Sequence, residues 1–278
     1  MFSTTKKFIT IILVFFSINS FSHEEGANFS GAIIDPLRVH HAHIEDEQRV
    51  NFSFINDVGN IDGNNTYSHS LELAINWDGN FRWGSEIFIP YSNTGRSGAD
   101  IGDIDIQLIK YAFINEPETI LTGIFGMSLP TGNKSKGLGG ENTAIEAALF
   151  LDKAYKNWYW GLNLELGTVV SGENETEFEL ATAVSYSFID GTTDLASPKP
   201  QQNFVPSVSF ELVSENILSG AEEGTNVVTV IPGLHLWHPK SDWSIRFGVE
   251  IPVSSDKEND RVYLLQIGTH KDWGGIFN

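Results

Sequence analysis

The sequence has no cysteine among its 278 residues. Without cysteine we expect no disulfide framework, no thiolate metal site and no lipoprotein anchor, which needs a cysteine at the cleavage site. Basic residues are scarce, with 17 Lys and Arg against 36 Asp and Glu. Such an acidic chain repels phosphate, so we expect no nucleic-acid partner. After residue 22 no stretch approaches the ~18 uncharged apolar residues of a membrane-spanning helix.

The first 22 residues have the layout of a secretory signal peptide. Lys6 and Lys7 precede an apolar run over residues 8–18, and a small-x-small site follows at residues 20–22. The run is too short to span a bilayer as a helix. We therefore predict that residues 1–22 are removed, which also removes two lysines and changes the formal net charge from −19 to −21.

The remaining chain alternates apolar and polar residues with a period of two. In WYWGLNLELGT (residues 158–168), Trp158, Trp160 and Leu162 fall on one face, whereas Gly161 and Asn163 fall on the other. The segments HSLELAINW, EFELATAVSYSF and WSIRFGVEIPV repeat the pattern. Alternation over this length predicts strands with one apolar and one polar face.

Turn residues divide this pattern into about twelve strands, an even number of ~10-residue strands as in bacterial outer-membrane barrels. The expected starts lie near residues 49, 69, 81, 102, 119, 142, 158, 177, 203, 225, 243 and 261. Short connections such as DGN and PKSD alternate with longer glycine-rich ones, and the segment over residues 189–203 is longer than this alternation predicts. We therefore predict an all-β fold: a transmembrane antiparallel β-barrel over residues 49–278, with short periplasmic turns and longer extracellular loops, preceded by a periplasmic segment over residues 23–48.

The tryptophans separate this prediction from a soluble β-sandwich. Tryptophan gathers where hydrocarbon meets water. Each tryptophan lies next to a short connection or at the end of the last strand, so all are expected at one membrane interface, whereas a sandwich would spread them through its core. The residues are Trp77, Trp83, Trp158, Trp160, Trp237, Trp243 and Trp273.

The polar faces of the strands are expected to point into the barrel. Twelve strands lie between the roughly eight that leave a filled interior and the roughly sixteen that leave an open channel. A narrow path for one small solute follows, with Phe88, Tyr111 and Trp237 as interior apolar contacts. The predicted interior polar residues are Glu72, Arg82, Glu86, Asp103, Asp105, Gln107, Asn163, Glu165, Glu211, Arg246 and Glu250.

Two neighbouring strands resemble a known family. The runs GDIDIQLIKYAF and LTGIFGMSLPTGN carry a Gly102-Asp103 opening, a Lys110-Tyr111 pair and a Pro130-Thr131-Gly132 exit. They are similar to the outer-membrane barrel family named for the meta-pathway of phenol degradation. The resemblance implies a barrel in the outer membrane of a Gram-negative bacterium that transports small, often aromatic, hydrophobic compounds. It supplies no catalytic residue.

Three readings of function stay open. The first is passive passage of a small solute, with outer-membrane lipid and lipopolysaccharide as surroundings, the latter bridged by divalent cations. The second is a structural barrel that conducts nothing. The third is a lipid-modifying barrel enzyme, which needs a serine or histidine pair with an orienting group at the lipid-facing rim. No G-x-S-x-G motif accompanies the histidines, so we expect no enzyme and no cofactor.

A histidine-rich stretch, RVHHAHIEDE, precedes the first predicted strand. If it is extended, His41 and His43 share a face, and such a pair can hold a divalent metal with Glu45 or Glu47 as a third ligand. The competing readings are a solvated lead-in and a segment resting in the barrel mouth.

Overall fold

In the computed structural model, the structure describes residues 36–56, 66–77, 81–93, 99–136, 138–172, 174–189, 203–238, 243–257 and 260–269. The predicted signal peptide, Trp273 and most of the long segment over residues 189–203 lie outside the described residues. None of the described residues forms a helix long and apolar enough to cross a membrane.

Twelve long strands and one short strand form a single antiparallel sheet. A short 3₁₀ turn, η1 (Lys134–Lys136), lies between β6 and β7. The strands are β1 (Glu47–Asn56), β2 (Thr66–Asn76), β3 (Trp83–Asn93), β4 (Ala99–Ile101), β5 (Ile104–Glu116), β6 (Thr119–Leu129), β7 (Ala144–Tyr155), β8 (Trp158–Val169), β9 (Thr176–Ser187), β10 (Val205–Ser219), β11 (Asn226–His238), β12 (Trp243–Pro252) and β13 (Arg261–Thr269).

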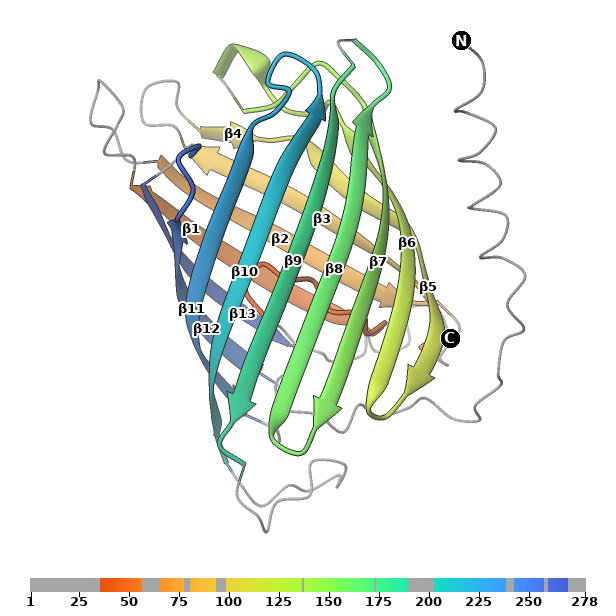
Figure 1. Ribbon diagram of the computed structural model, residues 1–278, viewed down its shortest axis with the longest axis vertical. Helices are drawn as coiled ribbons and strands as arrows, with labels where there is room; N and C mark the ends of the chain where they lie inside the picture. Colours follow the sequence, from red (N-terminus) through yellow and green to blue (C-terminus); the bar gives the residue numbers. More distant parts are fainter. Residues whose placement is uncertain are drawn as a thin grey trace.

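The sheet closes on itself, because β1 pairs with β13 along its whole length and β2 pairs with both β1 and β3. Each long strand pairs with its neighbours in sequence, except that β3 pairs with β5 beyond the three-residue β4. The predicted count of twelve is confirmed, and the sandwich alternative is wrong because a closed sheet has no free edges. Figure 1 shows the resulting tilted barrel.

Every predicted strand begins within three residues of its place in the structure, with β4 as the addition. One end of the barrel carries the tight turns β5–β6 and β7–β8, where two residues join the strands; we call it the short-turn end. The other end, the long-loop end, carries the connections over residues 130–143 and 220–225 among others.

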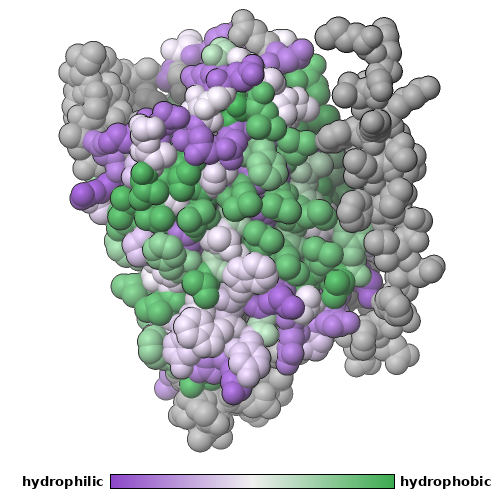
Figure 2. Space-filling model, viewed as in Figure 1, coloured by the Kyte–Doolittle hydropathy of each residue, from purple (hydrophilic) through white to green (hydrophobic). Residues whose placement is uncertain are grey.

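An apolar belt covers the outside of the barrel. Figure 2 shows it as a green band between a purple long-loop end and a paler short-turn end. The belt follows from the alternation, since every second residue of a strand faces outward. Exposed members include Phe52, Leu71, Phe125, Phe210, Leu234, Ile245, Phe247 and Leu265.

Candidate functional site

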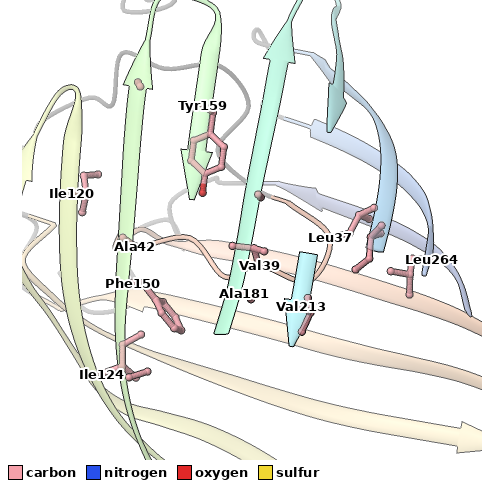
Figure 3. Packing of buried hydrophobic residues seen from close by; sticks show 14 of the residues in the cluster. Leu37, Val39, Ala42, Ile120, Ile124, Phe150, Tyr159, Ala181, Val213 and Leu264 are labelled. Atoms are coloured by element: carbon pink, nitrogen blue, oxygen red, sulfur yellow. The ribbon is translucent and has the colours of Figure 1, made fainter. Parts of the chain in front are cut away.

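Residues 36–46, which we call the plug segment, cross the interior of the barrel. Leu37, Val39 and Ala42 belong to the buried apolar cluster together with wall residues of seven strands. Figure 3 shows them on the inner segment, with Phe150, Tyr159, Val213 and Leu264 on the surrounding strands. The segment over 23–48, expected in the periplasm, therefore lies inside the barrel at residues 36–46 and enters β1 at Glu47; residues 23–35 lie outside the described residues.

Glu211 of β10 holds the first half of the plug segment. Its Oε1 accepts the backbone N–H of Leu37 at 2.7 Å, and its Oε2 accepts those of Arg38 at 2.9 Å and Val39 at 3.0 Å. Successive N–H groups aimed at one point form an anion-binding concavity. The wall therefore supplies the anion, and the fully buried Glu211 carboxylate is satisfied by the plug backbone.

Asn163 of β8 holds the middle of the plug segment at both backbone polar groups of one residue. Its Oδ1 accepts the His40 N–H at 2.6 Å, and its Nδ2 donates to the His40 carbonyl at 2.8 Å. The His40 ring stacks on Phe150 with centroids 5.5 Å apart and meets Phe88 edge-on at 5.6 Å. One amide side chain thus replaces the two ladder bonds that a neighbouring strand would give.

Ala42 is fixed at both its backbone polar atoms. Its N–H donates to Asp152 Oδ2 at 2.7 Å, and its carbonyl accepts the Thr122 hydroxyl. Asp152 also accepts the Tyr159 hydroxyl at 2.7 Å. At the ends, Gln266 Nε2 donates to the Leu37 carbonyl at 2.8 Å, and Asp46 accepts the Asn76 N–H at 2.8 Å. Side chains of the wall thus satisfy the backbone of a segment that pairs with no strand.

A cluster of six buried charges lies beside the plug segment near the start of β1. Arg49 donates to Glu47 at 2.8 Å and to Glu72, and Arg246 lies 3.8 Å from the other oxygen of Glu47. Lys110 pairs with Glu86 at 2.7 Å. Three cations therefore face three carboxylates, and this balance is what makes their burial tolerable.

Lys110 is an interior residue that the alternation alone misses. Counting by twos from Gln107 places Tyr111 inside, but a β-bulge between Gln107 and Ile109 advances the register by one residue. Lys110 therefore points inward, whereas Tyr111 lies outside with its ring 4.4 Å from that of the exposed Trp83. The prediction of Tyr111 as an interior contact is wrong for this reason.

The Lys110–Glu86 pair gives a test of this register. We expect Lys110→Met to destabilise the barrel by about 3–5 kcal/mol, because it leaves the Glu86 carboxylate buried beside Glu72 without its cation. The measurement is the temperature at which purified protein loses its heat-modifiable migration on a gel. The double variant Lys110→Met/Glu86→Gln should recover part of the loss, and Tyr111→Phe should change little. Equal effects of Lys110→Met and Tyr111→Phe would contradict the register.

Most of the predicted interior residues line the inner wall. Glu72, Glu86, Gln107, Asn163, Glu211 and Arg246 are buried there, and Asp105, Glu165 and Glu250 line cavities above the plug segment. Arg82 lies in the β2–β3 turn, with its guanidinium 3.4 Å from the Ala112 carbonyl. Asp152, Thr122, Gln266, Glu47 and Arg49 were not predicted, although Asp152 shares its face with Glu146, which the alternation alone could have revealed.

Asp103 has a different place from the predicted one. Its two carboxylate oxygens accept the N–H groups of Gly132 at 2.8 Å and Gly140 at 2.6 Å, so it ties down the β6–β7 loop. Thr131 accepts the Ile104 N–H and donates to the Gly102 carbonyl, both at 3.0 Å. The Gly-Asp and Pro-Thr-Gly motifs are therefore in contact and build the long-loop end rather than the interior.

Five of the predicted interface tryptophans are exposed near the short-turn end: Trp77, Trp83, Trp158, Trp160 and Trp243. Trp237 differs, because it is paired with Val205 and Ser244, both buried on the inner face. Residues paired directly across two strands share a face, so Trp237 faces the interior. Its prediction as an interior contact agrees with the structure, and its prediction as an interface residue is wrong.

The predicted metal pair, His41 and His43, lies in the plug segment. His41 Nδ1 lies 3.0 Å from the His43 carbonyl oxygen, and the two rings are 6.4 Å apart. Among the described residues, His41 forms with Glu45 and Glu47 a group whose ligand atoms come within 4.8 Å of one another. Glu47 already accepts Arg49, whose charge opposes a cation there. Metal binding through His41 and His43 stays a prediction of the sequence.

Two cavities lie between the plug segment and the long-loop end, with volumes of about 550 Å³ and 270 Å³. Both are lined by Arg38, His40 and Glu165, so the two cavities are neighbours at these residues. The larger reaches Ser68 and Ala144, at the long-loop ends of β2 and β7. We call the two together the vestibule.

Comparison with known proteins identifies the type of fold. No family model matches the sequence, and no curated protein matches it either. An outer-membrane channel from Pseudomonas putida F1 superposes with a TM-score of 0.56 at 11% identity, covering 85% of this chain and 99% of that one. The NanC porin superposes with a TM-score of 0.51 at 11% identity, covering 82% and 100%. The chain has the fold of outer-membrane β-barrels, and membership of the meta-pathway family stays a prediction.

Proposed function

We propose that the protein is an outer-membrane channel for a small polar solute and that the plug segment is its barrier. The observation that carries the proposal is the closed barrel itself. Its outer face is an apolar belt, and its inner face is polar and holds a vestibule that ends on the plug segment. A polar interior with room for a solute is of use only if something enters it.

Outer-membrane barrels place long loops outside and short turns in the periplasm. With that orientation the vestibule opens to the exterior, and the plug segment lies between it and the periplasm. The exposed tryptophans then lie at the periplasmic interface. Lipid covers the belt, and divalent cations bridge acidic residues to lipopolysaccharide at the long-loop end.

The plug segment is held in place by hydrogen bonds from the wall. The wall holds it by side chains of single residues rather than by a strand ladder. Each such bond contributes about 0.5–1.5 kcal/mol net, or about 1.5–3 kcal/mol where a carboxylate accepts. The eight bonds from the wall to the backbone of residues 37–42 together contribute roughly 8–18 kcal/mol, so passage requires the segment to break a few of them at a time rather than to leave the wall at once.

The residues that line the vestibule also indicate the kind of solute that fits it. A cavity of about 550 Å³ accepts a small molecule. Its apolar surface includes Phe88, Pro90 and Leu264, but carboxylates and hydroxyls surround these residues. We therefore propose a polar solute with a small apolar part, rather than the hydrophobic compound implied by the family resemblance.

The enzyme alternative has one candidate group in the described part of the chain. Ser209 Oγ and His235 Nε2 are 2.7 Å apart and both are buried. They lie on the inner face beside Leu37, because a Cβ built at Gly233 would approach Ser209, His235 and Leu37 together. A lipid-modifying enzyme needs its nucleophile at the lipid-facing surface, so this pair does not favour that reading.

The experiment is flux through proteoliposomes. We expect the purified chain to pass small polar solutes faster than protein-free vesicles, with a steep loss of rate for solutes too large for a cavity of about 550 Å³. Heat-modifiable migration of the same preparation verifies that the barrel is folded. A folded barrel that passes no solute, even after its plug segment has been released, would support the non-conducting alternative instead.

A further inference from the structure

The vestibule is strongly acidic. Its charged lining consists, among the described residues, of eight carboxylates and two arginines. Arg49 is committed to Glu47 and Glu72, and Arg38 to Glu250 at 2.8 Å. The eight carboxylates are Glu72, Asp105, Glu146, Glu165, Glu177, Glu179, Glu215 and Glu250.

The carboxylates come from strands that meet around the same space. Glu146 lies on β7, Glu165 on β8, and Glu177 and Glu179 on β9. Glu165 interacts electrostatically with the other three acidic groups and is also hydrogen-bonded to Glu146, which two carboxyl groups can do only by sharing a proton. Like charges gathered in a half-enclosed cavity raise the local concentration of cations.

A second observation points to a ligand that donates hydrogen bonds. Gln107 is 6% exposed and lines the vestibule, yet none of the described residues donates a hydrogen bond to its Oε1. The same holds for Oδ1 of Asn51 and for Oε1 of Glu146 and Glu165. All four are acceptor oxygens, and a buried acceptor left without a donor costs about 1–3 kcal/mol. An occupant with several N–H groups would satisfy them.

The remaining lining indicates what the occupant carries besides its charge. Phe88 reaches the vestibule next to the His40 ring, and Leu37 and Leu264 add aliphatic surface. An aromatic face beside carboxylates attracts an ammonium group both electrostatically and through cation–π contact. A bare inorganic ion would use neither this surface nor the volume.

We propose that the vestibule binds a small organic cation, with an ammonium or guanidinium group between Glu146 and Glu165 and an apolar part against Phe88. The proposal deepens the proposed function, since it rests on a channel and names the class of its solute. The cation enters from the long-loop end, and its N–H groups donate to the Glu146, Glu165 and Gln107 oxygens.

The test uses three probes of one shape and different charge: benzylammonium, benzyl alcohol and benzoate. Calorimetric titration of the full chain in detergent should show benzylammonium binding most tightly. Glu146→Gln/Glu165→Gln should weaken its affinity by about tenfold or more, the scale of a charge-assisted hydrogen bond. The control Glu116→Gln/Glu118→Gln removes the same charge from exposed residues at the short-turn end and should leave the affinity unchanged.

Equal binding of the three probes, or no effect of the Glu146/Glu165 exchange, would overturn the proposal. The latter would mean that the two acids share protons and carry no useful charge. Neither result would contradict the proposed channel function, since flux through proteoliposomes is measured separately. Conversely, a barrel that binds benzylammonium selectively but shows no flux would support the cation site and contradict the proposed channel function.

Discussion

Replacing both Glu211 and Asp152 with alanine should raise the conductance of the barrel in planar bilayers by roughly tenfold or more. Glu211 accepts three backbone N–H groups of the plug segment, and Asp152 accepts a fourth. Each N–H left buried without an acceptor costs about 1–3 kcal/mol, and about 1.4 kcal/mol corresponds to a factor of ten. The plug segment is therefore expected to leave the wall, because water can hydrogen-bond the freed N–H groups.

The matched control is Glu146→Ala/Glu179→Ala. It removes the same charge from the inner face, and Glu146 lies on the same strand and face as Asp152. Neither residue makes a hydrogen bond to the described backbone of the plug segment in the structure. This variant should change ion selectivity but not the size of the conductance step. An equal rise in both variants would show that charge, and not the release of the plug segment, controls conduction.

The barrel fold could be predicted from the sequence because the pattern that specifies it is local. Alternation of apolar and polar residues reports directly which side of a strand meets lipid, and turn residues report where strands end. The strand from Trp158 onward illustrates this, because the outward residues from Trp158 to Leu166 are all apolar and the polar Asn163 falls on the inner face. That polar residue was predicted inside, but its partner could not be predicted.

The sequence offered the plug segment only as one of several readings, a segment resting in the barrel mouth, because its contacts are remote. Glu211 and Leu37 are 174 positions apart, and no local pattern links them. The pattern on the segment itself is weak. Apolar Leu37 and Val39 alternate with polar residues only briefly, and most of the residues that follow are histidines and acids. The wall held the better clue. Single polar residues such as Asp152 and Thr122 lie on largely apolar inner stretches and need partners. The Tyr159 hydroxyl of β8 gives Asp152 one partner, and the plug segment gives partners to both Asp152 and Thr122.

The wrong predictions for residues of the barrel wall also have a physical cause. A bulge changes the parity of every residue beyond it, so the placement of Lys110 and Tyr111 depends on one irregularity that composition does not reveal. Trp237 shows the second kind of error. Its position beside a short turn predicts a membrane interface, but parity along β11 turns it inward with His235.

The Leu37→Cys/Gly248→Cys variant should close the channel on oxidation and reopen it on reduction. A Cβ built at Gly248 of β12 would collide with the Leu37 Cδ1 atom, so the two positions face each other across the interior. Exchange of leucine for cysteine removes that collision and brings the Cβ atoms within reach of the separation of about 3.5–4.5 Å that a disulfide requires. Because the chain has no cysteine of its own, only this bridge can form.

The bridge is most informative in the Glu211→Ala/Asp152→Ala background. There it should return the raised conductance to the native level, because residue 37 of the plug segment is again tied to the wall, and a thiol reductant should restore the increase. Gly248→Cys alone should behave differently and raise conductance without any oxidant, since its side chain displaces Leu37. If the bridged and reduced forms conducted alike, the current would be passing beside the plug segment, and displacement of that segment would not be the gating step.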